Sequence, residues 1–161
     1  MKAINRNIFY RPMTPNGENI RLAGQVESDG KTHVSELKTE PQAQHLGCFA
    51  GGMVAIAAKM FQNDQELVLA RQLVEGCLWA YDVMPLGIMP AIMHVVACED
   101  KSYCPWDEKM WHQKVNEAHE GEADVQLKIQ QNRLRPGVVK VDDKRYNLRL
   151  VTLSMLSNEG S

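Results

Sequence analysis

The sequence lacks the features that would place it in several common classes of protein. Its 161 residues have a formal net charge of −2 and contain no block of basic residues, so we expect no nucleic-acid partner. No apolar run approaches the roughly 20 residues of a membrane helix, so we expect no membrane span in this chain. The N-terminus has no apolar signal core, and the absence of an Asn-x-Ser/Thr site leaves the compartment open.

Several catalytic motifs are also missing. The chain has no glycine-rich phosphate loop, no His-Glu-x-x-His helix and no serine nucleophile elbow. What it does have is an apolar share of 44% with 24% charged residues, a balance that supports a packed core. Its length fits one domain or a piece of a larger one.

Residues 44–84 predict two antiparallel helices. The first runs from about Gln44 to Phe61, and the second follows an Asn63-Asp64 cap with apolar residues at helical spacing. The short polar turn over residues 62–65 suits neighbouring antiparallel helices. The rest of the chain is expected to organise around this hairpin.

Cys48 and Cys77 lie at nearly equal distances from the turn. In an antiparallel hairpin the start of the first helix lies beside the end of the second, so the two sulfurs should meet. We expect Gly51, Gly52 and Gly76 to bring the helices close enough for a disulfide. Two buried free thiols are the alternative.

Cys98 and Cys104 flank a short polar loop that a second disulfide could close. A zinc site is the rival interpretation, although there is no Cys-x-x-Cys pair and His94 and His112 lack finger spacing. Disulfides form in oxidising compartments, which proteins usually reach with a signal peptide, and this N-terminus shows none. We therefore expect that Met1 is not the start of the mature protein.

Weaker patterns give the other expected elements. They are the end of a helix within residues 3–14, two short extended pieces at 19–24 and 32–37 around a turn at 28–30, a strand or turn at 91–97, a helix at 109–117 started by Pro105, and a β-hairpin over 138–149.

One resemblance gives the sequence a possible chemistry. The run from Gln44 to Met53 resembles the His-Leu-x-Cys-Phe signature of family 47 glycoside hydrolases, the class I α-1,2-mannosidases. The order of features is similar to that of the fungal members from about Ile4 to Arg149. The matching segments are residues 11–14, 44–53, 77–81, 87–90, 98–108 and 145–149.

The resemblance implies a mainly α fold, a partial (α/α)7 barrel of helical hairpins around a central cavity, with a short β-hairpin near the C-terminus. Residues 1–149 would be part of the catalytic domain, and residues 150–161 a divergent tail. The implied reaction is inverting hydrolysis of terminal α-1,2-mannose from high-mannose N-glycans, with bound Ca²⁺ and a place in the secretory pathway.

The family's catalytic carboxylates are missing from the expected positions. The family has Pro-Glu after the arginine matched by Arg149, whereas this chain has Leu150-Val151. Ala91 replaces the glutamate expected after Pro90. Other acidic residues belong to helices upstream of the Arg-Pro-Met segment, and the calcium-binding threonine falls beyond Ser161. We therefore expect a fragment that is inactive by itself, with no catalytic and no metal-binding residue.

The tail from residue 150 to 161 has lost the family pattern. We interpret it as a frameshift, a retained intron or a truncated gene model. Two other functions remain open beside the inactive fragment: a non-catalytic module that binds mannose glycans, and a non-functional gene product.

Two residues are candidates for substrate binding by resemblance. His45 matches the histidine of the signature, which lines the sugar site; taken alone it would be a helix-capping or surface residue. Arg149 is a possible donor to mannose hydroxyls or a solvated charge at a strand end. Phe49 could stack on a sugar, but its spacing favours the core.

A carboxylate cluster around the second cysteine pair offers a metal or acid–base alternative. Its members are Glu99, Asp100, Asp107 and Glu108. A solvated loop and acidic residues at a helix N-terminus explain these side chains more simply. The spaced methionines are expected to fill the core. They are Met53, Met60, Met84, Met89 and Met93.

Overall fold

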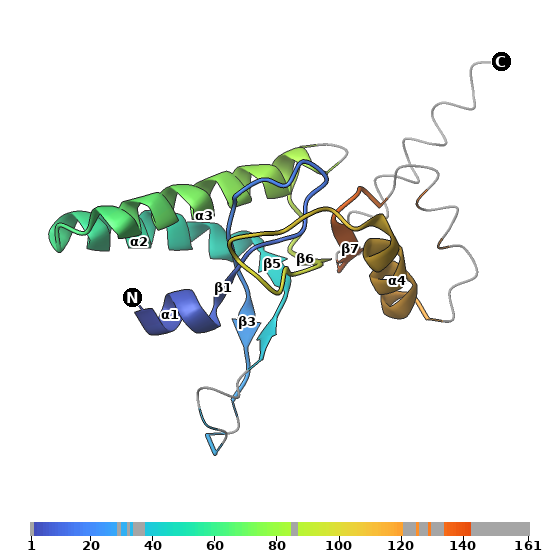
Figure 1. Cartoon of the computed structure of the whole chain (residues 1–161), viewed down its shortest axis with the longest axis horizontal. Helices are drawn as coiled ribbons and strands as arrows, with labels where there is room; N and C mark the ends of the chain where they lie inside the picture. The colour runs from blue at the N-terminus through green and yellow to red at the C-terminus, as the bar shows by residue number, and fades with distance from the viewer. Residues whose placement is uncertain are drawn as a thin grey trace.

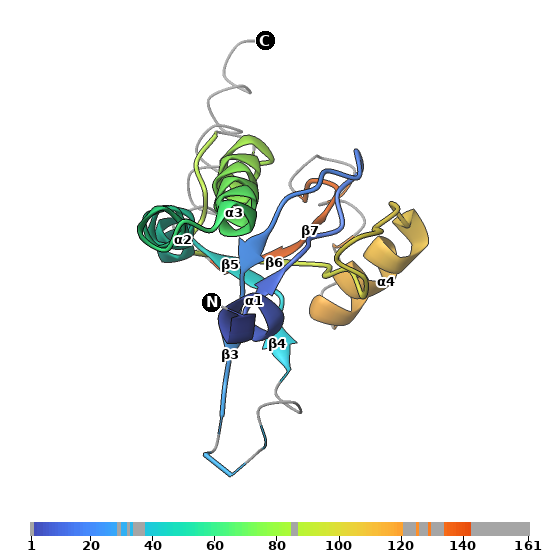
Figure 2. The same cartoon turned by 60° about the vertical axis from the view of Figure 1, so that its left-hand side comes forward.

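Figure 1 shows the chain as a computed structural model. The structure describes residues 2–28, 30, 31, 33, 38–84, 87–120, 125, 129 and 134–142. Two long helices lie side by side along one end of the molecule, the small strands follow, and a third long helix lies on the other side of them (Figures 1 and 2).

The described elements follow the chain in this order: α1 (Lys2–Asn7), β1 (Phe9–Tyr10), β2 (Leu22–Ala23), β3 (Gln25–Val26), β4 (Thr39–Glu40), β5 (Gln42–Gln44), the 3-10 helix η2 (His45–Cys48), α2 (Phe49–Met60), α3 (Asp64–Asp82), β6 (Ile92–Val95), α4 (Glu108–Ala118) and β7 (Val138–Val141). The chain is thus partly helical with small antiparallel sheets. The (α/α)7 barrel is not established by these residues.

The predicted helical hairpin is present as α2 and α3. The Asn63 side chain accepts a hydrogen bond from the backbone N–H of Glu66, so it is the N-cap of α3 that the sequence predicted. The first helix begins later than expected. Gln44 pairs with Ile92 as the end of β5, and the next four residues form η2, because strand pairing there replaces the first helical turn.

The glycines of the hairpin do not all act as predicted. A Cβ on Gly51 would lie 2.7 Å from Val74 Cγ2, so this glycine does let α2 approach α3. Gly52 faces open space, and a Cβ on Gly76 would lie 2.0 Å from the backbone oxygen of Arg21. Gly76 therefore allows the backbone at Arg21, just before β2, to pack against α3. The prediction that the glycines bring the two helices together was wrong for Gly52 and Gly76.

The strands form antiparallel pairs, β1 with β2 and β3 with β4, and a sheet in the order β5-β6-β7. The hairpin predicted from 19–24 and 32–37 was wrong in its arms. Strand β2, within 19–24, pairs with β1, and β3 pairs instead with β4 at Thr39–Glu40. Most of residues 32–37, where the second arm was expected, lie outside the described residues. The strand predicted within 91–97 is β6.

The N-terminal helix ends earlier than the apolar spacing indicated. Phe9 and Tyr10 form β1 and pair with Ala23 and Leu22, so backbone pairing removes them from the helix. The helix predicted at 109–117 is α4, but its N-cap is Asp107, whose side chain accepts from the Met110 N–H at 3.0 Å.

Strand β7 confirms one arm of the predicted C-terminal hairpin. The other arm, over 145–149, lies outside the described residues, and β7 pairs with β6. Trp111 of α4 donates its indole N–H to the Val138 oxygen at 2.9 Å, which ties α4 to this sheet. The main core lies here, between the sheet, the end of α3 and α4.

One face of α2 is exposed and apolar. We call it the α2 stripe: Leu46, Phe49, Met53, Ile56 and Met60, with exposed fractions between 53% and 73%. The opposite face, with Gly51, Val54 and Ala58, is buried. Phe49, Met53 and Met60 were expected in the core, which was wrong, because a helical apolar face does not specify what covers it. Met84, Met89 and Met93 are core residues as predicted.

Candidate functional site

His45 begins the η2 helix, immediately after β5. Its side chain is exposed, and its backbone N–H donates to the Ala91 oxygen at 3.3 Å. The imidazole meets the ring of Tyr81 edge-on, with centroids 6.0 Å apart and planes at 69°. A histidine held in this way by backbone and ring contacts can offer a nitrogen to a ligand hydroxyl.

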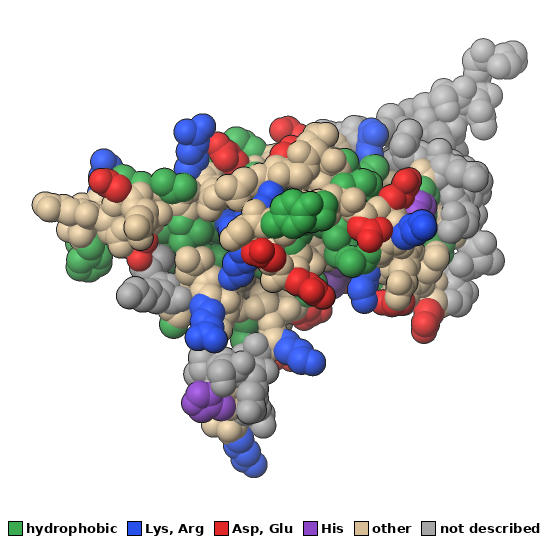
Figure 3. Space-filling view, viewed as in Figure 1, with side chains coloured by type: hydrophobic (Ala, Val, Ile, Leu, Met, Phe, Trp, Pro, Cys, Tyr) green, Lys and Arg blue, Asp and Glu red, His purple; other side chains and the backbone are tan. Residues whose placement is uncertain are grey.

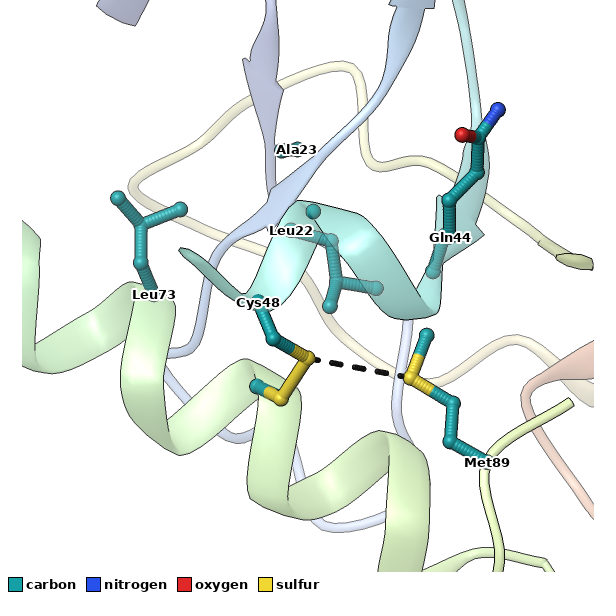
Figure 4. Close-up of a pocket in the computed structure, with 9 residues that line it drawn as sticks. Leu22, Ala23, Gln44, Cys48, Leu73 and Met89 are labelled. Carbon is teal, nitrogen blue, oxygen red and sulfur yellow. Dashed lines mark hydrogen bonds between the residues drawn. A yellow bond between two sulfur atoms is a disulfide. The ribbon is translucent and has the colours of Figure 1, made fainter. Parts of the chain in front are cut away.

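Both pairs of cysteines are disulfides in the structure. Cys48 and Cys77, with Cα atoms 5.5 Å apart, join η2 to α3 beside His45. The line from Cys48 Sγ to Met89 Sδ in Figure 4 spans 4.0 Å. Since Cys48 has no S–H in a disulfide, this is a packing contact between sulfurs. It lies at a cavity of about 10 Å³, at most the size of one water.

Three glutamine side chains from β3 and β5 meet at the strand that ends just before His45. No pattern in the sequence predicted this cluster. Gln25 Oε1 accepts from Gln42 Nε2 at 2.5 Å and from Gln44 Nε2 at 3.1 Å. Gln42 is buried, with 6% exposed, so the cluster is anchored in the sheet. Alternation along β5 places the side chains of 42 and 44 on the same face, which is the only sequence signal for them.

A groove of about 300 Å³ lies beside this cluster. Its lining comes from β2, β3, the end of β5 and η2, and contains no charged side chain. The lining residues are Ala23, Gly24, Gln25, Gln44, Leu46 and Gly47.

The second disulfide closes a loop that a buried arginine holds. Arg11 is 6% exposed and donates to four backbone oxygens, two of them at Lys101 and Ser102 inside the loop from Cys98 to Cys104. The arginine of the Arg-Pro-Met segment therefore fixes this loop to the N-terminal segment.

The described residues do not support the zinc alternative. Cys98 and Cys104 are bonded to each other, while His94 lies 3.0 Å from Asp142 and His112 lies 3.8 Å from Glu108. Among the residues that the structure describes, no group of three or more His, Cys, Asp and Glu side chains converges.

The acidic cluster has the simpler explanation. Asp107 caps α4, and Asp100 Oδ1 accepts from the Ser102 N–H at 2.7 Å within its own loop. Both are exposed, as are Glu99 and Glu108. These side chains serve local backbone hydrogen bonds and solvation.

Two other carboxylates have lowered pKa values, whereas a general acid needs a raised one. The hydrogen bond from Lys114 lowers the pKa of Glu117. Partial burial acts to raise the pKa of Asp142, but hydrogen bonds from His94 and Lys140 outweigh it and the pKa is lowered. A general acid for glycoside cleavage needs a raised pKa.

Arg149 and the tail at 150–161 lie outside the described residues. Ala91, where the resemblance would have placed a glutamate, is exposed beside buried Pro90.

Basic and acidic side chains are interspersed over the face in Figure 3. No helix within the described ranges is long and apolar enough to cross a membrane.

Comparison with known proteins decides the family. The family model described as glycosyl hydrolase family 47 matches residues 1–149. The chain belongs to glycosyl hydrolase family 47. No curated protein and no solved structure matches it. Membership indicates a glycosidase family with a glycan substrate, and together with the two disulfides it is consistent with a protein of the secretory pathway.

Proposed function

We propose that this chain is part of an inverting α-1,2-mannosidase, of the class I fungal type, that trims terminal α-1,2-mannose from high-mannose N-glycans. The observation that carries the proposal is the family 47 match over residues 1–149, which includes the His-Leu-x-Cys-Phe run with His45. In this proposal the chain supplies a wall of the substrate site and acts in the secretory pathway.

The chain by itself is proposed to bind without hydrolysing. Inversion needs a carboxylic acid and a carboxylate base roughly 6.5–9.5 Å apart. Ala91 and Val151 stand where the resemblance expects glutamates. The described carboxylates with shifted pKa values, Glu117 and Asp142, are shifted toward the ionised form, which cannot donate the proton.

The family's calcium ion does not fit the described residues. Ca²⁺ prefers six to eight oxygen ligands with several carboxylates. The part of the chain that the structure describes has no converging group of acidic side chains that would supply these ligands.

For the fold, the proposal is that α2 and α3 form one helical hairpin of an (α/α)7 barrel. The antiparallel pair, its disulfide and the α2 stripe support this, because the helices of a closed ring have neighbours on two sides.

A second candidate is a non-catalytic module that binds mannose glycans. It is favoured by His45, which is exposed with its ring oriented by Tyr81. The exposed α2 stripe instead favours the third candidate, a non-functional truncated product, because such surfaces promote aggregation.

Titration of the purified chain with α-1,2-mannobiose tests the proposed site. His45→Ala should weaken binding at least about tenfold, the size of a lost hydrogen bond of about 1.4 kcal/mol. His112→Ala is the matched control, since this histidine lies on α4. Equal binding by the two variants would show that His45 does not contact the sugar. No binding by the unmutated chain would contradict both the mannosidase fragment and the glycan-binding module.

A further inference from the structure

We propose that the groove beside β3 and the β5–η2 junction is a subsite for one uncharged sugar residue, held by the amide oxygen of Gln44, whose side chain Gln25 orients. The inference rests on the proposed function, because it gives the glycan a contact next to His45. The evidence for it is the glutamine cluster, the uncharged lining and the small residues that keep the groove open.

The amides are oriented before a ligand arrives. Gln25 Oε1 accepts from both Gln42 and Gln44, and Gln25 Nε2 donates to Glu27 Oε1 at 3.0 Å. Buried Gln42 fixes the position of this network. Because the rotamers are already restricted, a ligand that binds here loses less free energy in ordering them.

One acceptor in the cluster remains available. Gln44 uses its Nε2 toward Gln25, and within the described residues its Oε1 accepts no hydrogen bond. Figure 4 shows the Gln44 side chain rising from the end of β5, with its amide pointing away from the disulfide and Met89. An amide oxygen placed in this way suits a hydroxyl donor.

The lining selects a neutral ligand. A phosphate or carboxylate would need a cation, and no lining residue carries a charge. The Glu27 carboxylate, outside the lining, accepts from Gln25 Nε2 at 3.0 Å. Leu46, 70% exposed, adds an apolar wall against which the C–H face of a pyranose can pack. Amide groups with an apolar wall match a sugar, which has both hydroxyl and C–H surfaces.

Small residues keep the groove open. A Cβ on Gly24 would lie 2.6 Å from Thr39 Cγ2, so the close approach of β4 requires this glycine. A Cβ on Gly47 would meet only Ala23, at 3.6 Å, an ordinary contact. Gly47 is thus the position at which a larger side chain can fill the groove without forcing the backbone apart.

The groove borders the segment that carries His45. Gln44 and Leu46 line the groove and flank His45 in the sequence, whereas the imidazole itself meets Tyr81 and is not part of the lining. The test therefore measures the groove and His45 separately.

The test is titration of the full chain with α-1,2-mannobiose, mannose, glucose and galactose, using Gln44→Ala to remove the acceptor and Gly47→Val to fill the groove. Gln113→Ala on α4 and Gly52→Ala on α2 are matched controls, because Gln113 binds Glu117 and Gly52 faces open space. Circular dichroism and thermal melting identify any variant that is not folded.

We expect both groove variants to weaken mannobiose binding about tenfold, with the controls unchanged. Binding unchanged in Gln44→Ala and in a folded Gly47→Val would overturn the subsite and leave the proposed function standing. If the unmutated chain binds glucose or galactose but no mannoside, and the groove variants abolish it, the subsite stands and the mannosidase assignment fails. If no sugar binds, both fail.

Discussion

Individual glycines decide how closely segments of this chain approach one another. Gly76 and Gly52 have the same residue type and both lie in helices, yet one meets a backbone oxygen and the other meets nothing. The difference comes from the segment before β2, which is far from both glycines in sequence, so local pattern cannot predict it.

Gly76→Ala should destabilise the fold by about 1–3 kcal/mol, because the new methyl group would meet the Arg21 oxygen and the two segments would have to separate. Gly52→Ala should be neutral or stabilise by about 0.5–1 kcal/mol through helix propensity. Denaturant midpoints measure both, and equal midpoints for the two variants would contradict the packing described for Gly76.

Asp142 should make the stability depend on pH. Its pKa is lowered below the ordinary 3.8 by hydrogen bonds from His94 and Lys140, which outweigh the effect of burial. A lowered pKa gives stability that is present above pH 3.8 and is lost as pH falls through the folded-state value. Asp142→Asn should therefore lower stability at pH 7 and make no difference in strong acid.

The size of this effect should be small, about 0–1 kcal/mol, because the Asp142 side chain is 41% exposed. Thermal melting at both pH values measures it, with exposed Glu99→Gln as control. The same loss at pH 7 and in strong acid would show that charge is not the cause.

At the scale of elements, the two disulfides close loops of different length. Their sequence separations are 29 residues for Cys48–Cys77 and 6 for Cys98–Cys104. Loop entropy predicts losses of about 3.5 and 2 kcal/mol when each pair is replaced by alanine. Urea unfolding of the two double variants tests the order, and a larger loss for the short loop would show that its contacts with Arg11 matter more than its entropy.

The α2 stripe should bind hydrophobic dyes. Its five apolar side chains are each between 53% and 73% exposed, and contiguous apolar patches larger than a few hundred Å² are rare on monomeric proteins. Phe49→Ser with Ile56→Ser should reduce ANS fluorescence and aggregation. Gln65→Ser, at an exposed polar position on α3, should change neither.

The helical hairpin was predictable because its signals are local. They are a 3.6-residue period, the Asn63 cap and two cysteines at nearly equal distances on either side of the interhelical turn. The strands were less so, since several are two residues long and exist through partners distant in sequence, as Phe9–Tyr10 does with Leu22–Ala23. The glutamine cluster was missed for the same reason, because β3 and β5 meet only in the folded chain.

For the whole molecule, family membership and site chemistry give different information. The match over residues 1–149 identifies a glycosidase family. The described residues supply an exposed histidine, oriented amides and an uncharged groove, and the pKa values of Glu117 and Asp142 are lowered. These features support the proposal that the chain recognises a glycan without cleaving it.

The most direct test is incubation of the purified chain with a high-mannose N-glycan, with and without added Ca²⁺, followed by quantification of released mannose. The account predicts binding of the glycan and no release above a blank without protein. Release of mannose that is lost on heat denaturation of the chain would contradict it, because the chain would then contain the acid and base that it is proposed to lack.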